Sequence, residues 1–473
     1  MSEYDLLIIG GGINGAAIAR EAALNGLSVL LVEKDDLASH TSSASTKLIH
    51  GGLRYLEYYE FRLVREALQE RERLLRAAPH LIYPMAFVLP HENAVRPWWL
   101  VRAGLLLYDT IGGRISLPRS RGLRASDTLY RAPLKRPGRG FVYSDAWVDD
   151  ARLVVLNCLD AARHGAEIAT RTALLSARRD GERWRATLTD GREVAARILV
   201  NAAGPWVADT LALTGANARA GVRLIKGSHI VVPKLFEGDH AYMLQQPDRR
   251  IVFAIPYANG TTLVGTTDVP VARPEDATIS GDEIDYLCVA ANRFFTRAVA
   301  PADVLATYSG VRPLYDDGAA EAKAVTRDYV LELDEAGPKL LSVFGGKITT
   351  ARHLAEEALA KLGYPGRASR DALLPGGDIG AFDAFLAEVR RRWPELGPDH
   401  SYRMARAYGS LLHQMLADGP GESFGGGLRA REVDWLVTRE WARTTDDILW
   451  RRTKLGLPGA VDLARLQAYL DRR

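Results

Sequence analysis

A glycine-rich turn near the N-terminus constrains the fold of this chain more than any other feature. Three glycines with the spacing G-x-G-x-x-G come directly after a short apolar run of strand type: Gly10, Gly12 and Gly15. In such a turn the first glycine permits a tight bend, the second lets backbone N–H groups approach a pyrophosphate, and the third allows close packing of helix on strand. A helix over 15–25 and a buried strand over 28–33 complete a βαβ unit, and Glu33 can accept hydrogen bonds from an adenosine ribose. The sequence therefore predicts a dinucleotide-binding domain.

Flavin and nicotinamide dinucleotides both use this turn, so other parts of the chain have to distinguish them. A strand over 198–204 runs into a small-residue turn that contains Ala203 and Gly204. Another strand, over 340–346, leads into a Gly-Gly turn and a helix, where several residues can contact a ribityl chain, a pyrophosphate or a flavin carbonyl: Gly346, Lys347, Ile348 and Thr349. An elongated flavin dinucleotide would span all of these turns, which favours FAD.

The order of strands and helices predicts an α/β fold with interleaved domains. The segments expected to form a Rossmann-like FAD-binding domain are 1–80, 141–215 and 305–372. The segments expected to form an antiparallel β-sheet substrate domain are 81–140 and 216–304. Strand patterns stop near residue 373, so 373–473 is expected to be an all-helical C-terminal cap domain.

The charge balance and the cysteines exclude several classes of protein. The chain has 61 basic and 58 acidic residues, and the net charge of +3 gives no general nucleic-acid signature. Cys158 and Cys288 are the only cysteines, and both fall in amphipathic helical patterns. That excludes a disulfide framework and gives no metal-ligand spacing. We expect no nucleic-acid partner and no metal, with both thiols packed in the core.

The N-terminus and the most apolar window bear on cellular location. Glu3 and Asp5 precede the glycine turn and leave no room for a secretory signal, so a cytoplasmic protein is expected. The window from Trp98 to Tyr108 is interrupted by Arg102 and is shorter than the ~20 residues of a membrane span. Six arginines between 96 and 124 alternate with aromatic and leucine residues, a pattern that can lie among anionic lipid headgroups. An apolar helix tucked under the substrate domain explains the same pattern, and both interpretations stay open.

Beyond these patterns, the chain resembles a known family. TSSASTKLIHGGLRYLE (41–57) closely resembles the second fingerprint of the FAD-dependent, quinone-linked glycerol-3-phosphate dehydrogenases. Similarity continues through nearly the whole chain: YSDAWVDDARLV (143–154), RLIKGSHIVVP (223–233), VGTTD (264–268), YSGVRPL (308–314), TRDY (326–329), LLSVFGGKITTAR (340–352) and EWARTTDDILWRRTKLGL (440–457). The bacterial single-subunit members look most similar, and the differences fall in loops such as 112–140 and 366–400.

The resemblance implies a D-amino-acid-oxidase-like flavoprotein with a helical C-terminal cap. Its implied reaction is the oxidation of sn-glycerol 3-phosphate to dihydroxyacetone phosphate by hydride transfer from C2 to N5 of FAD. It also implies peripheral binding to the inner face of the cell membrane and electron transfer to a membrane quinone; the anionic lipid contact is expected from the arginine-rich segment 96–124. A homodimer is compatible with it. Because both cysteines are expected in helix cores and His50 has little claim to a covalent link, we expect noncovalent FAD.

The residues expected to act on the substrate lie inside the motifs. The planar fork of arginine suits a phosphate dianion, although ordinary salt bridging is the alternative for an arginine-rich chain. The candidate arginines are Arg54, Arg312 and Arg327. Arg312 is also expected to take part in catalysis, and Tyr55 and Thr266 are expected to contact the substrate. His229 lies in a predicted strand, where a neutral imidazole beside the flavin could take the hydroxyl proton; a structural histidine is the competing interpretation.

Cofactor contacts are expected mainly from the second fingerprint. The residues concerned are Thr41, Ser42, Ser43, Ser45, His50, Gly51, Gly52 and Leu53. Hydroxyl groups gathered immediately before LIHGG favour phosphate and flavin contact over a merely solvated loop. Asp268 is expected to contact the cofactor or the substrate, or to position the arginines.

Two other functions share the dinucleotide turn. An FAD-dependent amine or amino-acid oxidase that uses oxygen would need a carboxylate clamp instead of a site with several arginines for a dianion. A nonenzymatic flavin-binding sensor would show a flavin spectrum that no substrate bleaches. Both remain alternatives at this stage.

Overall fold

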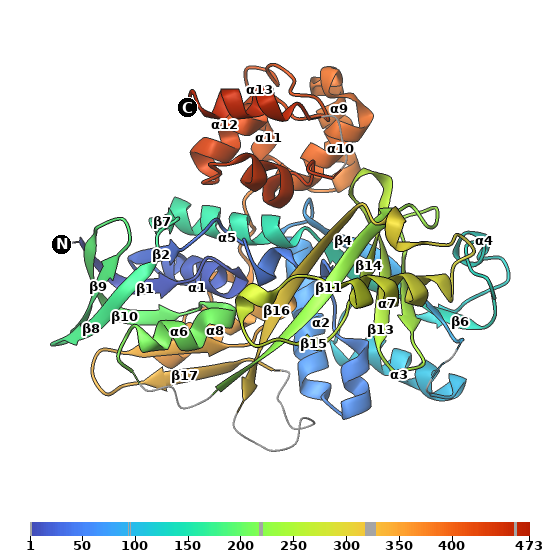
Figure 1. Cartoon of the computed structure of the whole chain (residues 1–473), viewed down its shortest axis with the longest axis horizontal. Helices are drawn as coiled ribbons and strands as arrows, with labels where there is room; N and C mark the ends of the chain where they lie inside the picture. Colours follow the sequence, from blue (N-terminus) through green and yellow to red (C-terminus); the bar gives the residue numbers. More distant parts are fainter. Residues whose placement is uncertain (1, 93, 95, 217–220, 317–327, 458–460) are drawn as a thin grey trace.

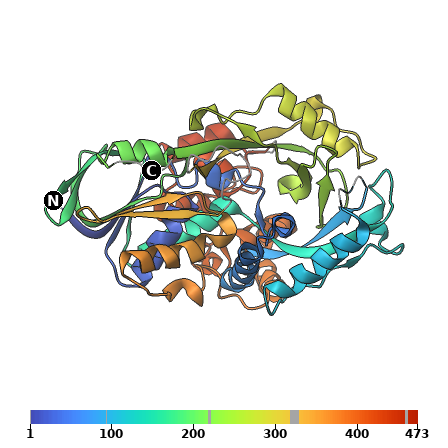
Figure 2. The ribbon, with the colours of Figure 1, turned by 90° about the horizontal axis from the view of Figure 1, so that it is seen from below.

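The computed structural model describes residues 2–92, 94, 96–216, 221–316, 328–457 and 461–473. Two large sheets lie side by side, and the helices of the C-terminal segment form a separate layer above them (Figure 1). Seen from below, the C-terminal layer lies behind the sheets (Figure 2). The predicted fold class, an α/β domain interleaved with an antiparallel sheet and followed by a helical domain, is confirmed.

The first sheet contains the glycine-rich turn. Its parallel strands follow the order β18-β10-β1-β2-β7, with antiparallel β17 at one edge and β8 and β9 extending from β10. The bounds are β1 Ser2–Ile9, β2 Val29–Glu33, β7 Glu167–Thr170, β8 Leu174–Asp180, β9 Arg183–Leu188, β10 Glu193–Asn201, β17 Val330–Asp334 and β18 Leu340–Phe344. Helices α1 (Ile13–Leu24), α5 (Asp150–Arg163) and α8 (Ala351–Leu362) cover one face. The central strands are therefore apolar throughout rather than alternating.

The second sheet is antiparallel except for the pairing of β4 with β12. Its strands are β3 Leu48–Ile49, β4 Ile82–Pro90, β5 Arg121–Gly122, β6 Gly140–Val148, β11 Gly221–Pro233, β12 Ala241–Gln245, β13 Ile251–Tyr257, β14 Thr261–Gly265, β15 Val269–Pro270 and β16 Ala306–Asp316. Helix α7 (Gly281–Asn292) packs on one face, and α2 (Phe61–Ala77) and α3 (Trp98–Ile111) pack on the other. Shorter helices and turns are α4 Thr128–Arg131, α6 Val207–Ala212, η1 Thr41–Ser43, η2 Leu53–Tyr58, η3 Gly204–Trp206 and η7 Ile348–Thr350.

The predicted domain boundaries differ from the sheets at three strands. Strands β3, β6 and β16 fall inside the segments predicted for the cofactor-binding domain, but all three pair in the second sheet. Strand β16 pairs with β11 from Ala306 to Asp316, so a division at 304/305 separates two strands that share one ladder. The sequence pattern locates strands well but does not reveal their partners.

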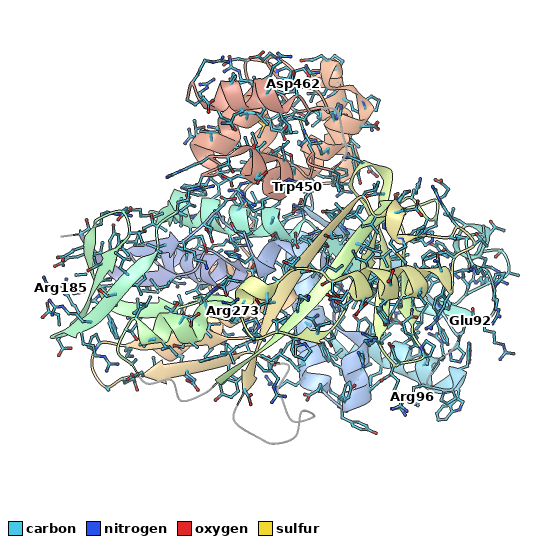
Figure 3. All side chains as sticks on the ribbon, in the orientation of Figure 1. Glu92, Arg96, Arg185, Arg273, Trp450 and Asp462 are labelled. Atoms are coloured by element: carbon cyan, nitrogen blue, oxygen red, sulfur yellow. The ribbon has the colours of Figure 1, made fainter. Side chains whose placement is uncertain are left out.

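The C-terminal segment is helical, as predicted. Its helices are α9 Phe382–Arg392, α10 Gly397–Tyr408, α11 Leu411–Met415, α12 Ala430–Arg439, the π-helix Asp447–Arg452 and α13 Leu463–Leu470. Their apolar core continues into α2 and α5, because Leu74 and Leu156 belong to the same buried cluster as Leu412 and Leu436. Trp435 is buried in this domain, whereas Trp450 is exposed on the side that faces the sheets (Figure 3).

Two further expectations concern the cysteines and the membrane. Cys158 in α5 and Cys288 in α7 are both buried and free, so both pack in the core. Among the residues that the structure describes, none of the helices combines the length and the apolar character that a bilayer span requires.

Candidate functional site

A cavity of about 1430 Å³ runs between the two sheets. Its walls come from the β1/α1 turn, the second fingerprint, the turns after β10 and β18, and strands β11, β13 and β16. Small-molecule sites are commonly ~300–1,000 Å³, so this cavity is large enough for an extended cofactor and a small substrate together. One end of the cavity is lined by the glycine-rich turn and Glu33. The other end is lined by Arg312 and His229.

The three glycines of the first turn have the geometry that the sequence predicts. Gly10 has φ +112°, and a Cβ there would lie 2.5 Å from the carbonyl oxygen of Ala202. Gly12 lines the cavity beside Ser42. A Cβ on Gly15 would overlap the carbonyl oxygen of Gly10, so Gly15 serves the packing of α1 on β1 and does not line the cavity.

Glu33 ends β2 at the wall of the cavity. Its carboxylate accepts the backbone N–H of Gly11 at 2.7 Å and that of Asp35 at 2.9 Å. Burial raises the pKa of Glu33, although the two N–H donors act against that shift. Nearby, Lys34 lies 3.6 Å from the centroid of the Trp206 ring. Trp206 lines the cavity and went unpredicted, although an aromatic residue directly after the turn that contains Gly204 was the signal for it.

The hydroxyl-rich loop approaches the cavity through most of its predicted residues. Ser42 Oγ accepts the backbone N–H of Ile13 at 2.9 Å, which joins this loop to the start of α1. Thr41 donates to the carbonyl oxygen of Val311 at 2.7 Å. Thr41, Ser42 and Ser45 line the cavity, but Ser43 does not; its hydroxyl donates to the carbonyl oxygen of His40. The structure therefore places Ser43 outside the cavity wall.

The following turn, His50 to Leu53, lines the cavity throughout. Gly51 donates its N–H to the Tyr108 hydroxyl at 2.7 Å, and Tyr108 donates to Asp145. Gly52 has φ +72°, a conformation that favours glycine. Burial lowers the pKa of His50, so this imidazole is neutral and embedded beside the turn.

The turn after β18 meets the first turn across the cavity. Asn14 of α1 donates to the carbonyl oxygen of Gly345 at 3.0 Å, and the backbone N–H of His50 donates to Thr349 Oγ1 at 3.3 Å. Gly346 has φ +97°, and a Cβ there would collide with the Asn14 side chain. The residues predicted in the two later turns all line the cavity: Ala203, Gly204, Gly346, Lys347, Ile348 and Thr349. Three tight backbone turns around one elongated cavity fit FAD.

The charged end of the cavity centres on Arg312 of β16. One guanidinium nitrogen donates to the carbonyl oxygen of Thr267 at 3.1 Å, and the other lies 3.3 Å from the Asp268 carboxylate. A Cβ on Gly227 would meet both the Arg312 guanidinium and Thr266 Oγ1, so these two groups are neighbours. The Asp268 carboxylate therefore contacts the Arg312 guanidinium.

His229 lies on β11 at this end and is 2% exposed. Its Nε2 is 3.1 Å from Thr46 Oγ1, and its ring stacks on Tyr308 with centroids 4.8 Å apart. Nδ1 has no hydrogen-bond partner among the described residues. Burial, together with the positive charges of Lys47 and Arg312, lowers the pKa of His229 to about 3. The imidazole is therefore neutral near pH 7 and can accept a proton.

The remaining predicted residues fall into two groups. Arg54 and Tyr55 line the cavity, and the Lys347 ammonium lies 4.2 Å from the centroid of the Tyr55 ring. Arg327 lies outside the described residues.

Two buried acids beside the site went unpredicted. Asp150, at the start of α5, pairs with Lys47, and Glu283 of α7 accepts hydrogen bonds from Ser228 and Thr267. The Ser228 and Thr267 hydroxyls, with the neighbouring Lys226 ammonium, hold the pKa of Glu283 at about 2 against the opposing effect of burial. No local sequence signal connects these partners, because each pair is far apart in the chain.

Comparison with known proteins defines the class. The sequence pattern described as "FAD dependent oxidoreductase" matches residues 5–352, which is most of the chain. This chain belongs to that family and binds FAD.

Full-length relatives narrow the assignment. A glycerol-3-phosphate dehydrogenase of Pseudomonas aeruginosa is 52% identical over 96% of this chain and 92% of its own length. The aerobic glycerol-3-phosphate dehydrogenase of Escherichia coli is 48% identical over 97% and 95%. A D-erythritol 1-phosphate dehydrogenase of Brucella abortus is 50% identical over 95% and 94%. Within the family, the chain therefore groups with the glycerol-3-phosphate dehydrogenases and this polyol-phosphate relative.

Solved structures agree. The glycerol-3-phosphate dehydrogenase of Bacillus halodurans, complexed with FAD, superposes with a TM-score of 0.76 at 27% identity, covering 99% of this chain and 89% of that one. A glycine oxidase of Geobacillus kaustophilus, at 22% identity and a TM-score of 0.57, covers 76% of this chain and 95% of its own, and shares the fold.

Proposed function

We propose that this protein oxidises sn-glycerol 3-phosphate to dihydroxyacetone phosphate. The observation that carries the proposal is the pairing of Arg312 with a buried neutral His229 at one end of the FAD cavity. A secondary alcohol that bears a phosphate needs a cation for the phosphate and a proton acceptor for the hydroxyl. Both groups line the same cavity wall.

Bound FAD supplies the acceptor for the C2 hydride. His229 takes the proton of the C2 hydroxyl, because its imidazole, unprotonated near pH 7, lies in the same cavity wall as Arg312. Arg312 holds the phosphate with its planar fork, and Arg54 adds positive charge. Tyr55 and Thr266 orient the substrate, and Asp268 aims the Arg312 guanidinium.

The relative from Brucella abortus motivates a second candidate substrate. D-erythritol 1-phosphate is also a phosphorylated polyol, so the same cation and proton acceptor would serve it. An amino-acid oxidase activity has weaker support, because the glycine oxidase of Geobacillus kaustophilus is 22% identical and shares the architecture only. The test of the proposal therefore includes two phosphorylated polyols, an unphosphorylated polyol and an amino acid.

Anaerobic bleaching of the ~450 nm flavin band tests the proposal. Purified protein is mixed separately with glycerol 3-phosphate, D-erythritol 1-phosphate, glycerol and glycine. We expect fast bleaching by glycerol 3-phosphate, far slower bleaching by glycerol and none by glycine. Faster bleaching by D-erythritol 1-phosphate would transfer the assignment to that substrate. Bleaching by glycine alone, or by no compound, would refute the proposal in favour of an oxidase or a flavin sensor.

We also propose that the FAD is noncovalent. Both cysteines are buried in helices away from the cavity lining, and His50 is embedded beside its turn. Acid precipitation is expected to release the yellow colour into the supernatant. Colour that remains in the washed pellet would contradict this.

For electron transfer, we propose a peripheral site on the inner face of the cell membrane, with quinone as acceptor. Helix α3 exposes Trp98, Trp99 and Leu106, and the neighbouring η2 turn exposes Tyr58 and Tyr59. Arg96 lies at the same lower edge of the molecule (Figure 3). Aromatic side chains beside arginines suit an anionic headgroup layer.

The homodimer is a separate prediction. Sedimentation of the detergent-free protein measures whether it forms.

A further inference from the structure

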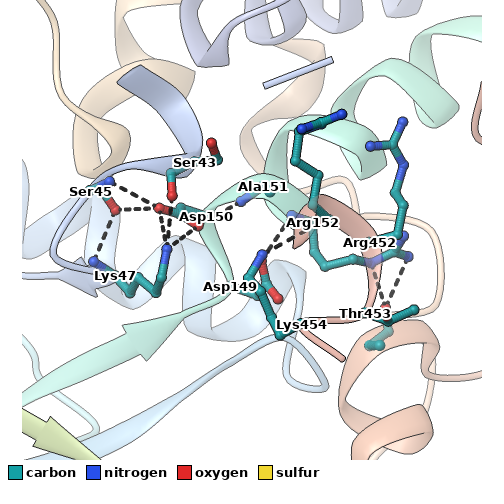
Figure 4. Close-up of polar contacts among 12 residues, drawn as sticks. Ser43, Ser45, Lys47, Asp149, Asp150, Ala151, Arg152, Arg452, Thr453 and Lys454 are labelled. Carbon is teal, nitrogen blue, oxygen red and sulfur yellow. Dashed lines mark hydrogen bonds and ion pairs between the residues drawn. The ribbon is translucent and has the colours of Figure 1, made fainter. Parts of the chain in front are cut away.

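A buried ion pair lies directly behind the hydroxyl-rich loop (Figure 4). Lys47 Nζ donates to the two carboxylate oxygens of Asp150 at 2.8 and 2.9 Å and to the carbonyl oxygen of Ser43 at 2.9 Å. The Lys47 side chain is 1% exposed and the Asp150 side chain is fully buried. All three donors of the ammonium are therefore used, and neither charge reaches solvent.

Asp150 also fixes the loop itself. Its Oδ2 accepts the backbone N–H of Ser45 at 3.1 Å and the Ser45 hydroxyl at 2.8 Å (Figure 4). Ser45 Oγ in turn accepts the backbone N–H of Lys47 at 2.9 Å. Lys47 itself has φ +60°, a conformation that a lysine rarely adopts without such restraints. The pair thus determines the path of the backbone on both sides of Thr46.

The restrained loop contacts the His229 ring directly through Thr46 and indirectly through Tyr308 of β16. Thr46 Oγ1 lies 3.1 Å from Nε2, at the edge of the imidazole. Tyr308, which covers the ring face, donates its hydroxyl to the carbonyl oxygen of Ser45 at 2.9 Å. The Lys47 ammonium lies 4.9 Å from the centroid of that tyrosine ring. The contact at the edge of the His229 ring and the contact at its face therefore both depend on the backbone of Ser45 and Thr46.

We propose that Lys47 and Asp150 are positioning residues that fix the orientation and the tautomer of His229 through Thr46 and Tyr308. A buried ion pair seldom stabilises a fold more than apolar residues of the same shape would, so a role in specifying geometry explains it better than a role in stability. Which nitrogen of an imidazole carries the proton is set by the hydrogen bond that the other nitrogen makes.

The C-terminal domain supports the other side of this arrangement. Asp149, next to Asp150, accepts the backbone N–H of Arg152 as the N-cap of α5 and lies 3.0 Å from the Lys454 ammonium. Arg152 forms an ion pair with Glu440. Figure 4 shows Arg152 and Lys454 beside Asp149. Two adjacent carboxylates therefore hold the first turn of α5 between the loop and the C-terminal domain.

The test uses three changes in the FAD-loaded protein. Lys47→Met with Asp150→Asn removes both charges together and avoids an unpaired buried charge. Thr46→Val removes only the hydrogen bond to His229, and Thr46→Ser restores the hydroxyl. The matched control is Arg403→Met with Glu432→Gln, an ion pair of 2.7 Å in the C-terminal domain with a buried glutamate and a partly buried arginine.

Two readouts separate positioning from folding. In wild type, ¹⁵N NMR of histidine-labelled protein, assigned with His229→Ala, should show one tautomer for His229. In the double variant and in Thr46→Val we expect a mixture of tautomers, and in Thr46→Ser and the control pair the single tautomer of wild type. The limiting rate of flavin reduction should fall roughly 10- to 100-fold in the double variant and in Thr46→Val. This loss is part of the 10²–10⁴-fold that a general base contributes. The dissociation constant of the substrate should change little.

A wild-type tautomer and a wild-type limiting rate in both the double variant and Thr46→Val would overturn the proposal. The rate arm rests on the proposed function, whereas the NMR arm needs no substrate. If glycerol 3-phosphate fails to bleach wild type, the proposed substrate is wrong, and the tautomer measurement still decides whether the pair positions His229.

Discussion

The two ends of the cavity are built differently. At the end that contains the first turn, Gly10 has a positive φ and no space for a Cβ. The other end carries charged and titratable side chains, chiefly Arg312 and His229. A cofactor that stays bound through turnover can be held by fixed backbone turns, whereas a reacting substrate needs groups that bind charge and accept a proton. Substitutions at the two ends should therefore fail in different ways.

The largest effect is expected from a side chain at the first glycine. Gly10→Val places a Cβ 2.5 Å from the Ala202 carbonyl oxygen and forces φ +112° on a β-branched residue. We expect folded protein that loses its FAD, and with it all activity. The ratio of absorbance at ~450 nm to protein after gel filtration measures this. Gly26→Val, at a positive φ with open space around it, is the control for backbone strain alone.

His229→Ala should act only at the substrate end. FAD retention and substrate binding should stay near wild type, while the limiting rate of flavin reduction falls about 10²–10⁴-fold. Part of the loss should be recovered at high pH, where the substrate hydroxyl loses its proton more readily. His240→Ala removes a buried histidine that directly precedes β12 of the same sheet and does not line the cavity. An equal loss of rate in both variants would count against a catalytic His229.

The pH dependence of wild type tests the charge state of His229. Because its pKa is lowered to about 3 from 6.5, the imidazole stays neutral from pH 8 to pH 5, and protonation should cost activity only as the pH falls toward 3. A histidine with an ordinary pKa would lower the rate about tenfold by pH 5.5. Stopped-flow reduction at saturating substrate avoids the titration of the phosphate itself. A fall with a midpoint near 6.5 that disappears in His229→Ala would contradict the assignment.

The smallest effect on the reaction is expected outside both ends. Trp98 is 37% and Trp99 67% exposed on α3, so a Trp98→Ala/Trp99→Ala variant should reduce flavin at the wild-type rate but float less with anionic liposomes. Trp450→Ala removes an exposed tryptophan from the C-terminal domain as a control. Wild type that floats with neither anionic nor neutral vesicles would remove the membrane site.

The comparison also explains how much the sequence could predict. The first turn was predictable to the residue: a Cβ would collide with backbone at Gly10 and Gly15, and Gly12 lies between them at the cavity wall. Ser43 was expected in the cavity wall with its neighbours, yet in the 3-10 turn its hydroxyl faces His40. Turn geometry decides that, and composition does not.

Contacts between distant segments were the least predictable part. Asp150 and Lys47 are 103 residues apart, and the sequence around either residue does not identify the other as its partner. The same holds for strand β16, which the predicted boundaries assigned away from its partner β11. Resemblance to a family located the motifs that carry these residues, but only the folded chain shows that they meet.

The central claim is that one end of the cavity holds the cofactor and the other end holds a phosphate. Arg312→Ala tests it most directly, with FAD content and kcat/KM measured on the same preparation. We predict full FAD retention and a loss of about 1.5 to 3 kcal/mol in transition-state stabilisation for glycerol 3-phosphate, roughly tenfold to 150-fold. Glycerol, which lacks the phosphate, should be nearly indifferent, and Arg312→Lys should recover only part of the loss. A variant that keeps its FAD and its full preference for the phosphorylated substrate would contradict the account.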